Sequence, residues 1–310
     1  MITHQLPHQP SVLPLRQTRK ERRRIKREQE KRTRKQFSLD LGIHAKYQIP
    51  DPLWRQISPL LPKPKDKKKP GRPRMDDRKA MTAILYLLKT GCQWKALPRS
   101  LGKSSTVHDR FTEWTQSGVF TKLWRQGVLD YDRKKGIQWE WQAMDGAQNQ
   151  APLGGECVGK SYKHRGKNGT NRSILVEGRG VPLSAVAERA NLNDFKLTQT
   201  TLSSLVVPRP TPTKEKPQHL CLDRGYDYPE VDQIVAAFGY TAHIARKGDD
   251  PTKREQPPVY RARRWVVERT HSWLNNFRRL LIRWEKKVAN YLGMLHFACA
   301  WISFRTAGIF

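Results

Sequence analysis

"QHLCLDRGYDYPEVDQIVAAFGYTAHIA", residues 218–245, contains the pattern that decides the fold. The short apolar run "LCL" is typical of a buried strand, and it stops at a carboxylate, Asp223. The segment "YPEVDQIVAAFG" predicts a helix, and "TAHIA" predicts another strand. Strand, helix and strand in succession are typical of an α/β sheet. An acid at the end of a core strand is costly to bury, so it calls for a functional explanation.

Segments on either side of this stretch complete the predicted domain. "QWEWQAMDG" (138–146) predicts a strand that ends on Asp145-Gly146, and residues 173–190 predict two strands around the turn Gly178-Arg179-Gly180. A helix is expected over 194–205, and two more over 260–284 and 287–304. Three strands, an alternation of helix and strand, and closing helices predict a mixed sheet flanked by helices over residues 138–310.

A smaller helical domain is predicted over residues 46–130, beginning with a short helix in "IPDPLWRQISPLLPKP". Asp76 or Asp77 could cap a helix that ends at Gly91, with an apolar stripe of Met81, Ile84, Leu85 and Leu88. Ser104 or Ser105 opens a second helix, with Val107, Phe111 and Trp114 expected inward and His108, Arg110 and Thr112 outward. Two short helices joined by a turn, in a basic setting, indicate a helix-turn-helix module.

The charge of the chain is its largest compositional signal. Its 310 residues carry a formal net charge of +31, which predicts a polyanionic partner such as nucleic acid. The mean hydropathy is -0.77, and the most apolar stretch, Tyr291–Phe304, is too short to span a bilayer, so no membrane association is predicted. The cysteines at 92, 157, 221 and 299 show no CxxC spacing, which argues against a disulfide framework or a zinc site. These features predict a cytoplasmic, nucleoid-associated protein.

Two basic segments could contact DNA directly. Residues 1–45 form an arm rich in Lys and Arg that has no apolar face; it could be disordered without DNA and helical on it. Further along, Pro70-Gly71-Arg72-Pro73-Arg74 resembles the core of an AT-hook, whose arginines lie in a narrow minor groove. The same five residues could equally be a linker that touches phosphate.

Three acids form the candidate site. Asp145 and Asp223 each follow a strand, and Glu268 lies on the helix over 260–284. That helix has apolar positions at Val266, Trp273, Phe277, Leu280 and Trp284, and a polar stripe on nearly the opposite face at Arg264, Glu268, His271, Asn275 and Arg278. Oxygen ligands of this kind suit Mg²⁺ or Mn²⁺, and a pair of such ions can cleave a phosphodiester. Taken singly, each Asp could instead be a turn or cap residue.

The chain resembles bacterial insertion-sequence transposases of the insertion sequence five family, which have a DDE site on a ribonuclease-H-like core. The matching segments are "IPDPLWRQISPLLP", "GRPRMDDRKAMTAILYLLKTGCQWKALP", "WQAMDG", "LCLDRGYD" and "RRWVVERTHSWLNNFRRL". The resemblance implies that Asp145 and Asp223 bind the ions and that Glu268 completes the site. Of the related signature Tyr-x2-Arg-x3-Glu-x6-Lys, the chain keeps Arg264 and Glu268, whereas Arg261 and Asn275 replace the Tyr and the Lys.

The resemblance predicts a metal-dependent enzyme that binds the terminal inverted repeats, cuts them and joins them to target DNA, working as a homodimer on double-stranded DNA. Arg264 could bind a phosphate or pair with Glu268, His271 is expected to be a plain helix-face residue, and Trp273 is expected in the core. Two alternatives are a catalytically inactive DNA-binding relative and a structure-specific nuclease. The residues predicted to contact DNA are Arg72, Arg74, His108, Arg110, Lys163, Arg165, Lys167, Arg264 and Arg278, with Lys160 and His164 beside them.

Overall fold

The computed structural model describes residues 41–63, 73–246 and 259–310, and residues Lys46–Phe310 form one compact unit. The basic arm before residue 41 and Arg72 of the AT-hook-like loop lie outside the described residues. None of the described helices is long and apolar enough to cross a membrane. The elements before the sheet are η1 (Ala45–Tyr47), α2 (Asp51–Ile57), η2 (Ser58–Leu60), α3 (Asp77–Thr90), η3 (Trp94–Ala96), η4 (Arg99–Leu101), α4 (Ser104–Gln116) and α5 (Val119–Lys135).

The ends of α3 follow from its sequence. Asp76 caps the helix by accepting a hydrogen bond from the Lys79 backbone N–H at 2.7 Å. Gly91 ends it with a positive φ of 72°, a conformation that glycine adopts without strain. The predicted apolar stripe of α3 and the inward residues of α4 are buried, so these expectations are confirmed.

The second half of the unit is built on one sheet. Its elements are β1 (Trp141–Gln150), β2 (Gly159–Ser161), β3 (Lys167–Glu177), β4 (Pro182–Arg189), η5 (Asp194–Leu197), α6 (Thr198–Ser203), β5 (His219–Leu222), η6 (Arg224–Tyr226), α7 (Pro229–Ala237), β6 (Thr241–Ile244), α8 (Val259–Asn275), η8 (Arg278–Leu280) and α9 (Val288–Thr306). The strand order is β2-β3-β1-β5-β6, with β4 also on β3. β1, β3 and β4 are antiparallel, whereas β5 and β6 run parallel to β1. This mixed sheet confirms the ribonuclease-H-like core that the resemblance implied.

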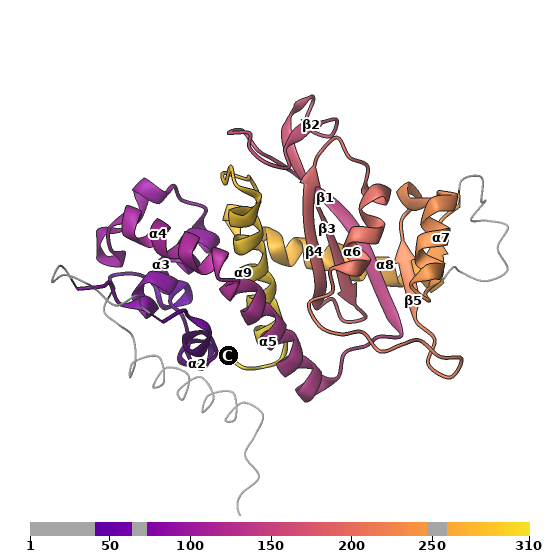
Figure 1. Cartoon of the computed structure of the whole chain (residues 1–310), viewed down its shortest axis with the longest axis horizontal. Coiled ribbons are helices and arrows are strands. Elements are labelled where there is room, and N and C mark those ends of the chain that lie inside the picture. The colour runs from indigo at the N-terminus through magenta and orange to yellow at the C-terminus, as the bar shows by residue number, and fades with distance from the viewer. Residues whose placement is uncertain (1–40, 64–72, 247–258) are drawn as a thin grey trace, which may run out of the picture. The chain divides into compact units, whose positions relative to one another are not determined.

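Helices cover both faces of the sheet. Figure 1 shows α6 and α7 in front of the strands and α8 behind them. Every second side chain along a strand points to the same face of the sheet. On one face Met144, Leu220 and Leu222 pack with Phe195 and Val231 in the core beneath α6 and α7. The side chains between them point to the other face of the sheet and therefore toward α8, which contacts β1, β3 and β5.

Two predicted element ends are wrong, and the first concerns β1. This strand does not stop at Asp145 but continues to Gln150. It loses its parallel partner β5 after Ala143, yet β3 remains paired with it as far as Gln150↔Gly169. The long-range partner thus extends β1 past the turn-like Asp145-Gly146, and Asp145 lies within a strand, next to the end of β5.

The helix predicted over 260–284 ends at Asn275. Phe277 leaves the helical conformation with φ −91° and ψ 90°, and a 3₁₀ turn follows at Arg278–Leu280. The chain then returns to β1, where Ile282 bridges Gln150 and the Arg283 N–H donates to the Gln150 carbonyl at 2.8 Å. A 3₁₀ turn keeps a spacing of three, so the apolar period persisted across the break and concealed it.

The faces predicted for α8 also need correction. Its buried side chains include Val267, Thr270, His271 and Leu274, whereas Trp273 is only half-buried, with the Arg269 guanidinium 4.7 Å from its ring centroid. The packing face is therefore rotated relative to the prediction, so that His271 points inward and Glu268 stays at the surface. A neutral imidazole packs as a small aromatic ring, which a pattern that counts only apolar letters misses.

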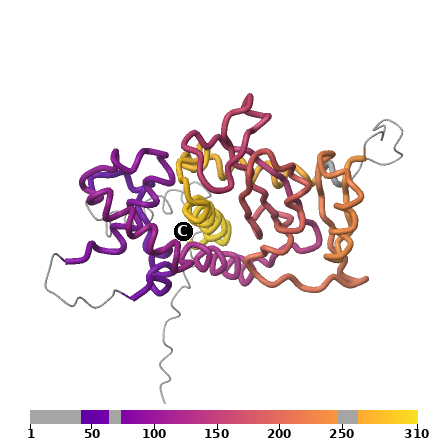
Figure 2. The backbone as a smooth tube through the Cα atoms, turned by 45° about the horizontal axis from the view of Figure 1, so that its top comes forward, coloured from indigo at the N-terminus to yellow at the C-terminus, as the bar shows by residue number. Residues whose placement is uncertain are grey.

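The helical residues and the sheet residues share a core through α5 and α9, which lie side by side in Figures 1 and 2. Gly127 of α5 permits this close approach, because a Cβ there would lie 3.1 Å from the Phe304 ring. Helix α9 is buried along most of its length, as predicted for the apolar stretch 291–304. The division into domains at 46–130 and 138–310 stays a prediction, since both parts belong to one compact unit.

Candidate active site

The sheet register brings Asp145 and Asp223 to the same place. Ala143 of β1 lies opposite Cys221 of the parallel strand β5. Asp145 follows Ala143 by two residues, and Asp223 follows Cys221 by two residues. Because side chains alternate along a strand, both acids project to the face of Ala143 and Cys221, the face on which α8 packs. The end of β5 leaves that side of β1 unpaired, which gives the carboxyl groups room.

Local hydrogen bonds fix both carboxylates. Asp145 accepts the Gly146 backbone N–H at 2.8 Å, and Asp223 accepts the Gly225 backbone N–H at 2.8 Å. The second bond caps η6, which begins immediately after Asp223. Each acid therefore keeps one anchored oxygen and presents the other to its surroundings.

Arg264 on α8 connects two of the three predicted acids. Its Nη2 lies 2.7 Å from Glu268 Oε1, and its Nη1 lies 3.8 Å from Asp223 Oδ2. Glu268 and Arg264 are one helical turn apart, so their contact is the pairing that an i,i+4 spacing favours. A single guanidinium thus holds Glu268 near the strand-end acids. Of the two roles that the sequence left open for Arg264, the pairing with Glu268 is the one observed in the structure.

Asp145 lies in the least favourable electrostatic position. Burial, and next the neighbouring Asp223 charge, raise its pKa to about 7, and the charge of Asp194 acts in the same direction. The Gly146 N–H and Arg264 oppose this increase without cancelling it. Two carboxyl groups that face each other without a cation cannot both ionise cheaply at neutral pH.

This raised pKa makes the stability of the cation-free protein depend on pH. In the folded state Asp145 keeps its proton from about pH 4 to about pH 7, whereas the unfolded chain releases it, so stability falls as pH rises through that window. Asp145→Asn cannot ionise and should remove this loss. In EDTA we expect urea unfolding to show the variant more stable than the parent by about 2–3 kcal/mol at pH 8 and little different at pH 4. An equal difference at both pH values would contradict the assignment.

The donor set suits a hard divalent cation only in part. Asp145 and Asp223 offer oxygen atoms at one edge, and their mutual repulsion is the kind that a bound cation relieves. Glu268 is instead turned onto Arg264. In the part of the chain that the structure describes, no group of three or more His, Cys, Asp or Glu side chains is placed to hold a metal ion. Glu268 would have to exchange partners to join the two aspartates.

Three further residues lie near these acids, and sequence reasoning gave none of them a role at the site. Asp194 opens η5, accepts from Asn171 Nδ2 at 2.5 Å and packs so closely on Gly146 that a Cβ there would lie 2.1 Å from its Oδ1. Tyr226 is fully buried, and its pKa is raised by burial and then by Asp194, Asp145 and Asp223. The buried ring of His271 lies near the Asp145 backbone, and burial lowers its pKa to about 3, so the imidazole is neutral. Tyr226 lies inside the quoted motif and His271 on the predicted polar stripe, whereas Asp194 had no sequence signal.

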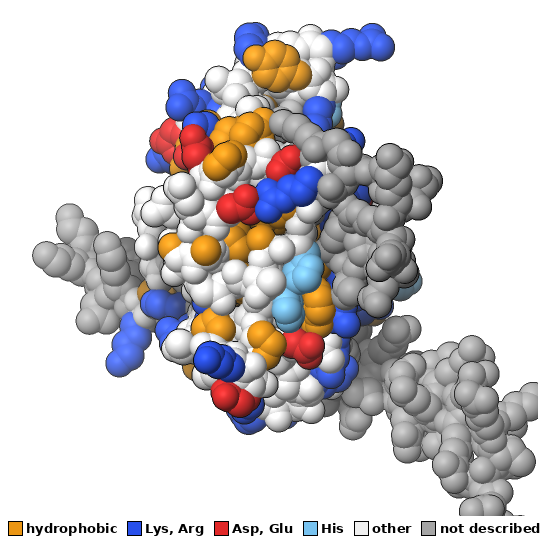
Figure 3. Space-filling model, turned by 90° about the vertical axis from the view of Figure 1, so that its right-hand side faces the viewer, with side chains coloured by type: hydrophobic (Ala, Val, Ile, Leu, Met, Phe, Trp, Pro, Cys, Tyr) orange, Lys and Arg blue, Asp and Glu red, His pale blue; other side chains and the backbone are white. Residues whose placement is uncertain are grey.

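Most of the predicted DNA contacts on the β2–β3 hairpin are exposed. Lys163, Arg165 and Lys167 are exposed together with Lys160, whereas His164 is half-buried. Tyr162, at the start of the loop, is 85% exposed, which is unusual for so large a ring. Figure 3 shows basic side chains around an exposed apolar one at the top of the molecule, whereas acidic and basic groups are interspersed on the face below. The hairpin thus combines cations with an aromatic surface.

The basic residues of the helical part behave differently. Arg110 is buried and points inward, contrary to the prediction, because it pairs with Glu113 at 2.9 Å and lies 3.7 Å from Asp77. Arg74 joins the same group, 3.3 Å from Asp77. Two cations and two acids thereby neutralise each other within the fold. His108, also in the helical part, is half-buried against Trp94. Arg278, the predicted DNA contact that follows α8, is exposed.

Comparisons with known families define the class. Residues 140–302 match the family model described as "Transposase DDE domain", and residues 49–124 match "Putative transposase of IS4/5 family". The first match spans more than half of the chain and contains all three predicted acids. The chain therefore belongs to the DDE transposases of insertion sequences, and the protein is a DNA transposase.

Two relatives come from the insertion element IS402 of Burkholderia cepacia. The "Putative transposase for insertion sequence element IS402" is 31% identical over 156 residues, which cover 48% of this chain and 69% of that protein. The "Insertion element IS402 uncharacterized 16.2 kDa protein" is 36% identical over 121 residues, covering 38% of this chain and 82% of that protein. A solved structure, the Mos1 mariner paired end complex with Mn, covers 78% of this chain and 82% of its own at 13% identity, but its TM-score of 0.25 is too low to show a shared fold.

Proposed function

We propose that this transposase binds the terminal inverted repeats of an insertion sequence with residues 46–130, and that residues 138–310 cut those ends and join them to target DNA. The observation that carries the proposal is the meeting of Asp145 and Asp223 beside the Arg264–Glu268 pair, within the matched DDE domain. A protein that only binds DNA has no need of two facing acids that destabilise its own fold.

Asp145, Asp223 and Glu268 are the residues that would hold the metal, which we propose to be two ions of Mg²⁺ or Mn²⁺. When bound, the ions supply Lewis-acid chemistry, activating water and stabilising the leaving oxygen of a phosphodiester. The all-oxygen donor set supports this choice of metal. The raised pKa of Asp145 implies that protons compete with the cations below about pH 7.

Arg264 is the residue that exchanges partners in this proposal. With 40% of its side chain exposed, it can leave Glu268 and Asp223 for a phosphate of the bound DNA, where a guanidinium fits two oxygens. This exchange frees the Glu268 carboxylate to turn toward the aspartates. DNA binding and completion of the acid site would then occur together, which keeps the enzyme inactive when it is free of DNA.

The reaction needs no covalent enzyme intermediate. Water attacks the phosphodiester at the element end; the P–O bond to the 3′ oxygen breaks, and the products are a 3′-hydroxyl and a 5′-phosphate. The 3′-hydroxyl then attacks a phosphodiester of the target in line, forming one P–O bond as another breaks. The enzyme's own groups orient these oxygens and move protons, so no Ser or Tyr nucleophile is required.

The proposed DNA path follows the exposed cations. Lys163, Arg165 and Lys167 would contact phosphates while Tyr162 stacks on an exposed base or sugar, and Arg278 extends the path from the end of α8. Arg74 and Arg110 instead stabilise the helical part through their ion pairs. Both ends of an element must be held together, so we propose a homodimer on DNA, acting in the cytoplasm on the nucleoid.

A panel of duplexes tests the proposal against its two rivals. We expect cleavage at the end of a terminal repeat, leaving a 3′-hydroxyl, with Mg²⁺ or Mn²⁺ present and none in EDTA. A scrambled repeat of equal length should remain intact. Cutting of forks and hairpins regardless of sequence would indicate a structure-specific nuclease, and repeat binding without any cutting would indicate an inactive DNA-binding relative.

A further inference from the structure

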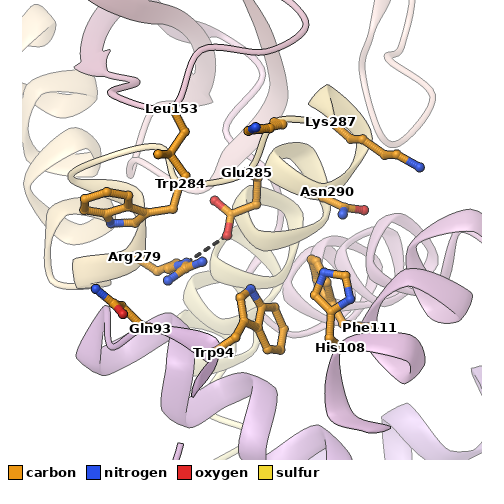
Figure 4. A pocket seen from close by; sticks show the side chains of 11 residues that line it. Gln93, Trp94, His108, Phe111, Leu153, Arg279, Trp284, Glu285, Lys287 and Asn290 are labelled. Atoms are coloured by element: carbon orange, nitrogen blue, oxygen red, sulfur yellow. Dashed lines mark hydrogen bonds and ion pairs between the residues drawn. The ribbon is translucent and has the colours of Figure 1, made fainter. Parts of the chain in front are cut away.

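A cavity of about 570 Å³ lies apart from the acids, between the helical part and the segment that precedes α9. Trp94 of η3, together with His108 and Phe111 of α4, forms one side, and Leu153 and Trp284 form the other (Figure 4). The volume is within the range of small-ligand sites, about 300–1,000 Å³. Trp94, His108, Phe111 and Trp284 give it aromatic surfaces beside several polar and charged residues, and none of Asp145, Asp223 and Glu268 lines it.

The cavity contains a buried acceptor with spare capacity. Glu285 lines it, and only 4% of its side chain is exposed. Its Oε1 accepts from Arg279 Nε at 2.8 Å, whereas its Oε2 has no hydrogen-bond partner among the described residues. A buried carboxylate oxygen without a partner is costly, and the cost disappears when a ligand donates an N–H to it.

The wall that carries Glu285 is held firmly in place. The buried Arg283 donates to the Glu285 carbonyl at 2.9 Å, and the Glu156 N–H donates to the Lys286 carbonyl at 2.9 Å. The Glu156 side chain accepts from the Val288 N–H at 2.9 Å. The cavity is thus preformed, which reduces the entropy cost of binding.

Cations line the opening. Lys286 and Lys287 are exposed at the edge of the cavity, and Figure 4 shows Lys287 extending away from Glu285. Aromatic walls, an N–H acceptor inside and cations outside match three parts of a nucleotide: the base plane, its amino edge and its phosphate. The base must be unpaired, because a paired base hides that edge in the duplex.

We propose that this cavity binds one unpaired nucleobase of the bound DNA, stacked against Trp94 and Trp284, with its amino group donating to Glu285 and its phosphate on Lys286 and Lys287. Cytosine, adenine and guanine carry such an amino group, whereas thymine does not. The proposal rests on the protein being a DNA transposase. It does not depend on which acids bind cations.

Bulged duplexes in EDTA provide the test, so that metal chemistry cannot influence the result. One duplex carries a single unpaired cytosine, a second carries thymine, and a third carries an abasic site at the same position. Fluorescence anisotropy with the full chain should show the cytosine bulge binding about tenfold tighter than the abasic one, and tighter than thymine. Equal affinity for all three bulges would overturn the proposal.

Variants assign the preference to this cavity. Trp94→Ala and Trp284→Ala should each lose the preference for the cytosine bulge over the abasic site. Glu285→Gln should keep that preference and lose only the preference for the cytosine bulge over the thymine bulge. Gln can still accept from Arg279, and thermal melts check that each variant is folded. The matched control is Trp265→Ala, because Trp265 is 50% exposed on α8 and does not line the cavity. Ratios unchanged in all three cavity variants would place the base elsewhere and overturn the proposal.

Discussion

Replacement of Asp223 by asparagine is expected to abolish cleavage at the element ends, lowering the single-turnover rate by about 10³-fold or more. The amide has the shape of the carboxylate and can still accept the Gly225 N–H, so the fold is kept. It lacks the negative charge that a divalent cation requires. Anisotropy with a terminal-repeat duplex should give a Kd within about twofold of the parent, because no phosphate contact is removed.

Asp232→Asn is the matched control for this prediction. Asp232 is a partly exposed acid on α7 that pairs with Arg246 at 2.8 Å and is not one of the three candidate residues. We expect its cleavage rate to stay within about twofold of the parent, since a surface ion pair contributes little. Cleavage that persists in Asp223→Asn at the rate of this control would show that the role proposed for Asp223 is wrong.

Arg283→Met is expected to produce the largest loss of stability, about 3–4 kcal/mol. The guanidinium is buried and donates to the backbone of Glu156, Cys157 and Glu285 and to the Thr170 hydroxyl. Methionine fills a similar volume but cannot donate a hydrogen bond, so the Glu156 and Glu285 carbonyls lose the bonds that Arg283 gives them inside the protein. Urea unfolding of the two proteins, with unchanged m-values, measures the difference.

Arg133→Met separates the loss of buried hydrogen bonds from the loss of charge. Arg133 has 71% of its side chain exposed and pairs only with Asp130 at 2.8 Å in the described structure. Its replacement should cost less than about 1 kcal/mol. If the two variants were equally stable, the interior hydrogen bonds of Arg283 would not be the source of its effect.

Local patterns were sufficient for much of the fold. The caps of α3, its buried stripe and the turn between β3 and β4 depend on residues within a few positions of each other, and these predictions are confirmed. The end of β1 depends on β3, whose residues pair with it across a long stretch of sequence, from Asp145↔Ile174 to Gln150↔Gly169, and no local signal at Asp145 reveals it. The break in α8 was hidden for a similar reason, because the 3₁₀ turn retained the apolar spacing.

The candidate site divides in the same way. Asp145 and Asp223 could be predicted because each sits in a short recognisable segment and the parallel register then aligns them. Asp194 could not, since an acid at the start of a helix is an ordinary cap until the fold sets it against Gly146. Trp94 and Glu285 are far apart in the sequence, so only the packing of α4 near α9 creates the cavity between them.

The contact between α5 and α9 affects how the protein is made. A ribosome releases residues 119–135 well before it has translated residues 288–306, so α5 must wait for the helix that covers it. The nascent N-terminal half carries its basic side chains but lacks the apolar surface that completes its packing. We therefore expect a chain cut short before α9 to leave the apolar face of α5 uncovered and to be degraded rather than to accumulate as a stable fragment.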